Sequence, residues 1–154
     1  MELFYEICKE NMGEPFVFLD VDIQFFSSIA DILLEELEDY DIACQHDIHQ
    51  YNSGQFICMA NDRTLSMFEK MKAEYTLEDQ TTLNHHLHMC KHKFLSKRFF
   101  TVGHAINKQW DGENFEIPTN IVSHHANWVV GVDNKIKIMD IVREKYDRLS
   151  ATSV

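Results

Sequence analysis

The sequence predicts an α/β fold, in which a sheet is flanked by helices. Short apolar segments rich in β-branched and aromatic residues alternate with amphipathic segments of helical period. Apolar residues make up 45% of the chain, with only two prolines and five glycines, which is typical of an ordered globular protein. A chain of 154 residues can bury one core, so we expect a single domain over residues 1–150 and a frayed tail at 151–154.

The individual elements follow from these patterns. A helix is expected over residues 2–12, ended by Gly13 and Pro15. The continuous apolar run at 16–21 predicts a central strand that is buried on both faces. Further strands are expected at 41–45, 54–60, 98–102 and 120–127, and further helices at 28–37, after a cap at Asn61 or Asp62, after a cap at Thr76, and from Asn134 to about Leu149.

Charge and composition exclude several classes of protein. The formal net charge of −11 argues against a nucleic acid or an anionic membrane held by bulk electrostatics, and an anionic substrate would need a bound cation to offset it. No apolar stretch is long enough to span a membrane, and the first residues lack the pattern of a signal peptide. The four cysteines are widely spaced, which indicates reduced thiols. We therefore expect a cytoplasmic protein.

Two aspartates at the end of the first predicted strand are the main candidate site. In "FVFLDVDIQFF", Asp20 and Asp22 are separated by one valine, so on a strand both carboxylates would point to the same side. Two close like charges repel unless a cation lies between them, and hard oxygen ligands suit Mg²⁺ or Mn²⁺. The alternative is that the strand ends in a solvated turn.

A histidine-rich segment, "NHHLHMCKHK", is a competing candidate site. If it is helical, His88 and His92 lie one turn apart and could bind zinc with Cys90 or His85. The simpler interpretation is a solvated helix face rich in histidine. A histidine-rich zinc-binding protein is thus one alternative function.

Several segments in order resemble one family. The segments "LDVDIQFF", "DIACQHD", "EDQTTLN", "IPTNIVSHHANW" and "GVDNK" are similar to motifs of the nucleotide-diphospho-sugar transferases of the GT-A fold, from about residue 4 to residue 145. The resemblance implies a metal-dependent glycosyltransferase that moves a sugar from a nucleotide diphosphate to an acceptor hydroxyl on a glycan, a protein or a small molecule. It favours UDP-sugar donors and a retained anomeric configuration.

The resemblance also assigns roles to residues. It implies that Mn²⁺ or Mg²⁺ is bound by Asp20, Asp22 and His125, the last rather than His124, which would face the other side of a strand. It implies catalytic positions for Asp79 and Gln80, donor-side positions for Asn52, Ser53 and Gly54, and diphosphate contacts for Gly131 and Lys135. Simpler explanations exist for most of them: Asp79 has the spacing of a helix cap after Thr76, Asn52 and Gly54 are common turn residues, and Lys135 suits an exposed first helical turn.

The sequence departs from the family at its start. Only 19 residues precede Asp20, too few for the nucleotide-binding βα units that normally come first in this fold, so we expect an N-terminally truncated GT-A-like domain. A fragment, a minimal transferase and a non-catalytic remnant that acts as a binding or structural domain all remain open. Such a chain should bind donors weakly, with little preference for the base. It should also form a homo-oligomer through the uncovered flank of strand 16–21.

Overall fold

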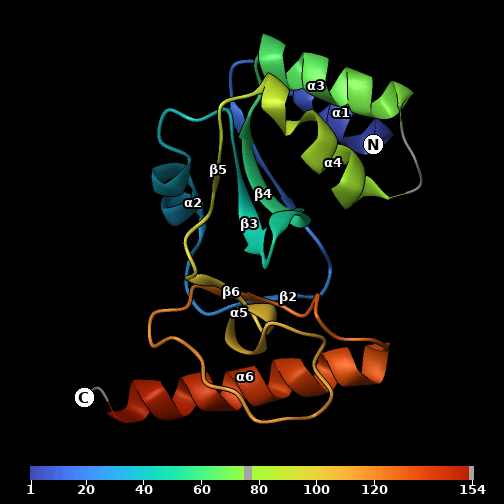
Figure 1. The fold of residues 1–154 in the computed structure, drawn as a ribbon. Coiled ribbons are helices and arrows are strands. Elements are labelled where there is room, and N and C mark those ends of the chain that lie inside the picture. Colours follow the sequence, from blue (N-terminus) through green and yellow to red (C-terminus); the bar gives the residue numbers. More distant parts are fainter. Residues whose placement is uncertain (75–77, 153–154) are drawn as a thin grey trace. The chain divides into compact units, whose positions relative to one another are not determined.

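The structure is a computed structural model that describes residues 1–74 and 78–152. The chain forms two compact units, each described here by itself: the first comprises Met1–Leu19 and Ala30–Ser96, and the second comprises Asp20–Ile29 and the chain from Lys97 on (Figure 1). Both units combine helices with a sheet, as an α/β fold requires. None of the described helices is both long and apolar enough to cross a membrane.

The first unit is built on a sheet with the strand order β1-β4-β3-β5. Its elements are, in chain order, α1 (Glu2–Glu10), β1 (Pro15–Leu19), α2 (Ala30–Leu37), β3 (Ile42–Asp47), β4 (Gln50–Met59), α3 (Asp62–Ala73), α4 (Asp79–His86), the 3-10 helix η1 (Leu87–Met89) and β5 (His92–Phe94). Strand β4 pairs antiparallel with β1 and with β3, whereas β5 pairs parallel with β3, so the sheet is mixed.

Strand alternation distributes the apolar side chains between the two faces of this sheet. Cys44 and Phe56 lie opposite each other in the register and belong to the core cluster that α1 and α3 cover. The adjacent pair, Ala43 and Ile57, points to the opposite face, where α2 lies (Figure 1). Because both faces are covered, residues on both faces of β3 and β4 are buried, in nearly continuous runs along the chain.

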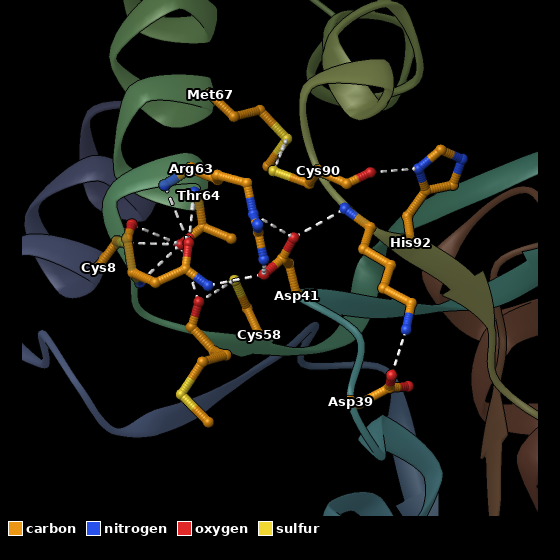
Figure 2. A network of polar contacts seen from close by, with 12 residues as sticks. Cys8, Asp39, Asp41, Cys58, Arg63, Thr64, Met67, Cys90 and His92 are labelled. Atoms are coloured by element: carbon orange, nitrogen blue, oxygen red, sulfur yellow. Dashed lines mark hydrogen bonds and ion pairs between the residues drawn. The ribbon is translucent and has the colours of Figure 1, made fainter.

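A buried carboxylate joins three elements of the first unit. Asp41, just before β3, accepts hydrogen bonds from Asn61 Nδ2 at 2.7 Å, from Arg63 Nε at 2.8 Å and from the backbone N–H of Lys91 at 2.8 Å (Figure 2). Burial opposes ionisation, but these donors outweigh it and lower the pKa of Asp41 below its ordinary value. The ionised side chain thereby fixes the starts of β3, α3 and the segment leading into β5.

The predicted cap of α3 is confirmed. The Asn61 side chain accepts hydrogen bonds from the backbone N–H groups of Arg63 and Thr64, and the Thr64 hydroxyl in turn accepts from the N–H of Asn61. Asn61, rather than Asp62, is therefore the cap. The cap predicted at Thr76 lies outside the described residues.

The second unit contains a smaller sheet with the strand order β2-β7-β6. Its elements are, in chain order, β2 (Ile23–Phe25), β6 (Phe99–Thr101), α5 (Gly103–Ile106), β7 (Ser123–His125) and α6 (Val132–Thr152). Helix α6 is attached to β2 by side chains from both: Gln24 Nε2 donates to the Met139 carbonyl at 2.8 Å, and Arg143 donates to the Phe25 carbonyl at 2.9 Å. Ile138 and Val142 of α6 are fully buried.

The structure corrects the prediction of a central strand at 16–21. Strand β1 lies at the edge of its sheet and, within the described part of the chain, pairs only with β4. Only Phe16 of this strand is buried, and Val17 is 40% exposed, so the apolar run does not mark a strand covered on both faces. An antiparallel edge strand can leave one face uncovered, which explains how so apolar a run lies there. Whether this edge pairs with a second copy remains a prediction.

Other differences concern short elements and helix ends. The three-residue strands β2 and β5 and the single-turn helix α5 were not predicted. The helix predicted from Ser28 begins at Ala30, and the last helix begins at Val132, before Asn134, and continues beyond Leu149 to Thr152. The histidine-rich segment is not one helix: α4 ends at His86, and His92 lies in β5. His88 and His92 are therefore not one helical turn apart.

Candidate functional site

The two aspartates lie in the turn that connects β1 to β2, at the start of the second unit. Strand β2 pairs antiparallel with β7, with Ile23 opposite His125, and the N–H of Ala126 donates to the Asp22 carbonyl at 3.0 Å. This pairing places His125 beside the turn. Val21, between the two aspartates, is fully exposed, so the carboxylates converge through the turn and not through strand alternation.

The side chains of Asp20, Asp22 and His125 form a compact group. His125 Nε2 lies 3.3 Å from Asp22 Oδ1 and 3.6 Å from Asp20 Oδ2, and one ligand atom of each residue lies within 4.8 Å of the others. The Lys135 ammonium, from the first turns of α6, forms an ion pair with Asp22 Oδ2. The structure thus brings together Asp20, Asp22, His125 and Lys135, as a group of two acids and two basic side chains.

The electrostatics of this group are those of two acids held by cations. The hydrogen bond from His125 lowers the pKa of Asp22 far below its ordinary value; burial opposes this shift, and Lys135 adds to it. Burial by itself would lower the pKa of His125, but Asp20 and Asp22 raise it above its ordinary value. Without a metal, the Lys135 ammonium and, whenever it is protonated, the His125 imidazolium offset the two carboxylates.

His124 and His125 differ in their surroundings, as predicted. The His124 ring is fully buried, 5.8 Å from the Phe100 ring, and neither of its nitrogens has a hydrogen-bond partner among the described residues. Burial lowers its pKa to about 3, so it is a neutral core side chain. Only His125 lies beside Asp20 and Asp22.

Gly131 precedes α6 and adopts a left-handed conformation, with φ of 86°. Its carbonyl accepts a hydrogen bond from the Lys135 N–H at 3.0 Å, and an added Cβ would meet no atom within 4 Å. The glycine is therefore required by backbone conformation, because a side chain there would be strained although space is available. It sets the start of the helix that carries Lys135.

The predicted donor-side residues Asn52, Ser53 and Gly54 lie in the first unit, together with Gln80, which was predicted to be catalytic. Gln80, in the first turn of α4, donates through Nε2 to Asp47 Oδ2 at 2.8 Å and accepts at Oε1 from Asn52 Nδ2 at 2.8 Å. Asn52 Oδ1 accepts from the Gly54 N–H at 2.8 Å. Ser53 is buried beside them in β4. This group, Asp47 with Asn52 and Gln80, is called the amide network below.

Asp79 lies outside the amide network. It is exposed at the first position of α4, and its Oδ1 accepts a hydrogen bond from the Gln80 N–H at 2.8 Å. Glu78, not Asp79, occupies the cap position. The structure thus places Asp79 next to Gln80 without joining its carboxylate to Asp47 or Asn52 in any hydrogen bond among the described residues.

Sequence reasoning missed Asp47, a member of the amide network, and Asn84, which holds α4 next to it. Asp47 ends β3 and had no motif to distinguish it, although it lies in the quoted segment "DIACQHD". The Asn84 side chain forms two hydrogen bonds with the backbone of Tyr51: its Oδ1 accepts from the Tyr51 N–H at 2.9 Å, and its Nδ2 donates to the Tyr51 carbonyl at 2.7 Å. Asn84 thereby fixes α4 against β4.

The attachment by Asn84 gives a stability prediction. Replacing Asn84 by alanine should lower the free energy of unfolding by about 2 kcal/mol, because both hydrogen bonds to the Tyr51 backbone are lost, together with the one that Asn84 Nδ2 donates to the Gln80 carbonyl. Chemical denaturation measures this change. Asn11→Ala, which removes one exposed side-chain bond to the Ile7 carbonyl, is the control and should have a much smaller effect. Equal effects of the two changes would contradict the role given to Asn84.

The raised pKa of His125 predicts how pH affects the metal-free protein. A group whose folded pKa is raised stabilises the fold below its unfolded pKa, about 6.5, and loses that contribution as pH rises through the folded value. The contribution of His125 to the melting temperature should therefore be complete below about pH 6.5 and be lost as pH rises above it. In His125→Gln this pH-dependent loss should disappear, and an unchanged pH profile in that variant would contradict the assignment.

The fold is similar to that of a glycosyltransferase of known structure. The structure is similar to the crystal structure of the galactosyltransferase LgtC in complex with donor and acceptor sugar analogs, with a TM-score of 0.51 and 16% identity. The similarity covers 80% of this chain and 57% of that chain, so the chain spans just over half the length of that enzyme. At this identity the similarity concerns the fold alone, and it confirms the predicted α/β, GT-A-like class.

Family membership rests on the sequence. The nucleotide-diphospho-sugar transferase family matches residues 10–139, most of the chain, and the chain belongs to this family. The resemblance inferred from the motifs is thereby confirmed. A comparison with curated proteins gives no match.

Proposed function

We propose that this chain acts in metal-dependent glycosyl transfer, moving a sugar from a nucleotide diphosphate, UDP favoured, to an acceptor hydroxyl. The observation that carries the proposal is the convergence of Asp20, Asp22 and His125 beside Lys135. Membership of the nucleotide-diphospho-sugar transferase family supports the reaction class. The acceptor is a hydroxyl on a glycan, a protein or a small molecule.

The donor set fits a divalent cation. Two carboxylates and one imidazole, with ligand atoms within 4.8 Å of one another, offer the oxygen-rich set that suits Mn²⁺ or Mg²⁺. When bound, such a cation would offset the negative charge of the leaving diphosphate. Asp20, Asp22 and His125 would hold it, and His125 would have to give up its proton first.

Lys135 has a role of its own in this proposal. Its ammonium is partly exposed and pairs with Asp22 in the metal-free protein. A cation that neutralises Asp22 would free the ammonium to contact a phosphate as a point charge. In a chain of net charge −11, this lysine and the cation would be the groups that make a dianionic diphosphate acceptable.

The amide network is proposed to bind the donor sugar. Its side chains combine a carboxylate acceptor with amide groups that both donate and accept, which is the mixture that sugar hydroxyls require. Gln80 and Asp79 are proposed as the residues nearest the reacting centre, with Asn52, Ser53 and Gly54 on the donor side. Gly131 is proposed to allow close approach of the backbone to the phosphates.

A paired substitution tests the metal part of this proposal. His125→Ala should weaken Mn²⁺ binding and Mn²⁺-dependent binding of UDP by about tenfold or more, because a coordinating nitrogen is lost. Among the molecules that remain folded, His124→Ala should change neither affinity by more than about twofold from wild type, because His124 lies in the core and not at the site. Calorimetric titration of UDP with and without Mn²⁺ measures both. Tight UDP binding that does not need the metal would contradict the proposal.

A further inference from the structure

A second group of possible metal ligands lies where α3 and α4 end. Glu74 follows the last residue of α3, and His85 and His86 are the last two residues of α4. One nitrogen or oxygen of each lies within 4.8 Å of the others. Two of the three ligands are imidazoles, whereas the group at Asp20 and Asp22 is rich in oxygen. The two groups therefore favour different metals.

The hydrogen bonds of His86 define which of its nitrogens is available. Its Nδ1 lies 2.9 Å from the Thr82 carbonyl, and a carbonyl only accepts, so Nδ1 carries a proton. In the neutral ring, Nε2 then has a lone pair and no proton, and it lies 3.0 Å from Glu74 Oε2. Two acceptors cannot form a hydrogen bond with each other. Either a proton, carried by Nε2 or by the Glu74 carboxyl, or a metal ion must therefore lie between them.

The same arrangement is the usual one for a metal-binding histidine. Such a ligand generally donates its other N–H to a carbonyl or a carboxylate, which fixes the tautomer and the orientation of the ring. His86 is buried, with its orientation set by Thr82, one turn earlier in α4. The His85 ring is 5.0 Å from the His86 ring, centroid to centroid, and is exposed.

The group borders an open cavity. A pocket of about 260 Å³ is lined by Glu74, Thr81, Thr82, His85 and His86. This volume exceeds what one water molecule needs, so a fourth, non-protein ligand can be accommodated. Three protein ligands with one open position is a common set for Zn²⁺.

We propose that Glu74, His85 and His86 bind Zn²⁺, with Nε2 of His86 as the buried ligand. Zinc accepts two imidazoles and a carboxylate in a four-coordinate site, whereas Mg²⁺ prefers an all-oxygen shell. The ion would attach the end of α3 to the last turn of α4. Since α4 begins with Asp79 and Gln80, bound zinc would stabilise the helix that presents the amide network.

The test uses the full chain with Asp20 and Asp22 both replaced by alanine, so that the oxygen-rich group cannot bind the added metal. Zn²⁺ affinity is measured by competition with a chromophoric chelator, and Co²⁺ absorption reports the coordination geometry. Glu74→Gln and His85→Ala are the informative variants, because both side chains are exposed and their loss should not disturb the core. His88→Ala, exposed in the following turn, is the matched control.

We expect one Zn²⁺ per chain, an intense tetrahedral Co²⁺ spectrum, and an affinity at least about tenfold lower in Glu74→Gln and in His85→Ala. His88→Ala should bind like its parent. At a free zinc concentration about 100 times the Kd, the melting temperature should rise by about 5 °C. The proposal is overturned if the parent binds no Zn²⁺, if both variants bind as tightly as the parent, or if His88→Ala weakens binding equally. In those cases His86 and Glu74 form only an ion pair.

Discussion

Replacing Asp22 by alanine should reduce Mn²⁺ affinity and Mn²⁺-dependent sugar transfer by about 100-fold or more. Residues that only hydrogen-bond to the ligands of a metal already contribute about 10- to 100-fold, and Asp22 would be a direct ligand. Asp22 also contacts both His125 and Lys135, so its loss removes the acid that organises the whole group. Its effect should exceed that of Asp20→Ala, because Asp20 is more exposed and lies farther from His125.

The control for this prediction is Asp147→Ala. Asp147 is exposed on α6 of the same unit, and its replacement changes the net charge by the same amount. If Asp147→Ala lowered Mn²⁺ affinity as much as Asp22→Ala, the effect would come from total charge. Metal titration and a donor-turnover assay measure both variants under the same ionic strength, since long-range charge effects depend on salt.

The second large effect should come from Asp41. Asp41→Ala should lower the free energy of unfolding by about 3 kcal/mol, at the lower end of the range for breaking a buried ion pair, because Arg63 is largely exposed and can be rehydrated. The Lys91 N–H and the Asn61 amide would also lose their acceptor. Urea denaturation at pH 7 measures this change.

The effect of Asp41 should depend on pH in a defined direction. A carboxyl whose folded pKa is lowered contributes stability above its unfolded pKa, about 3.9, and loses it as pH falls through the folded value. The difference between wild type and Asp41→Ala should therefore be constant near neutral pH and decrease below about pH 4. Asp39→Ala removes a neighbouring exposed acid and should leave stability unchanged. A difference that grows on acidification would contradict the network.

The strongest local patterns in the sequence predicted the corresponding elements. The short apolar runs of β3 and β4 and the side chains that cap α3 each depend on neighbouring residues only, and all three elements were predicted. The start of β4 was not: the strand predicted at 54–60 begins at Gln50, so Asn52 to Gly54 lie in the strand and not in a turn before it. The three-residue strands β2 and β5 are too short for a period to be recognised. Strand β1 was placed at the centre because its apolar run resembles a strand covered on both faces, a feature that tertiary packing decides.

The candidate site residues also divide into those that nearby sequence indicated and those that only the folded chain brings together. The Asp20 and Asp22 pair followed from their spacing, and His125 was preferred to His124 because of the family resemblance; the structure places these three side chains together, although the two aspartates lie in a turn and not on the predicted strand. The sequence did not indicate that Asp47 would meet Gln80, because the two are far apart in the chain and Asp47 has no motif of its own. The convergence of Glu74 with His86 depends likewise on how α3 packs against α4.

The most direct test of the central claim is an Mn²⁺ titration of the 154-residue chain followed by electron paramagnetic resonance, with wild type compared to the Asp20→Ala/Asp22→Ala variant at pH 7.5. The account predicts that wild type binds one Mn²⁺ and that UDP is bound only when Mn²⁺ is present. The double variant should bind neither the metal at this position nor UDP. Mn²⁺ binding of equal stoichiometry and affinity in the two proteins would contradict a metal site at Asp20, Asp22 and His125.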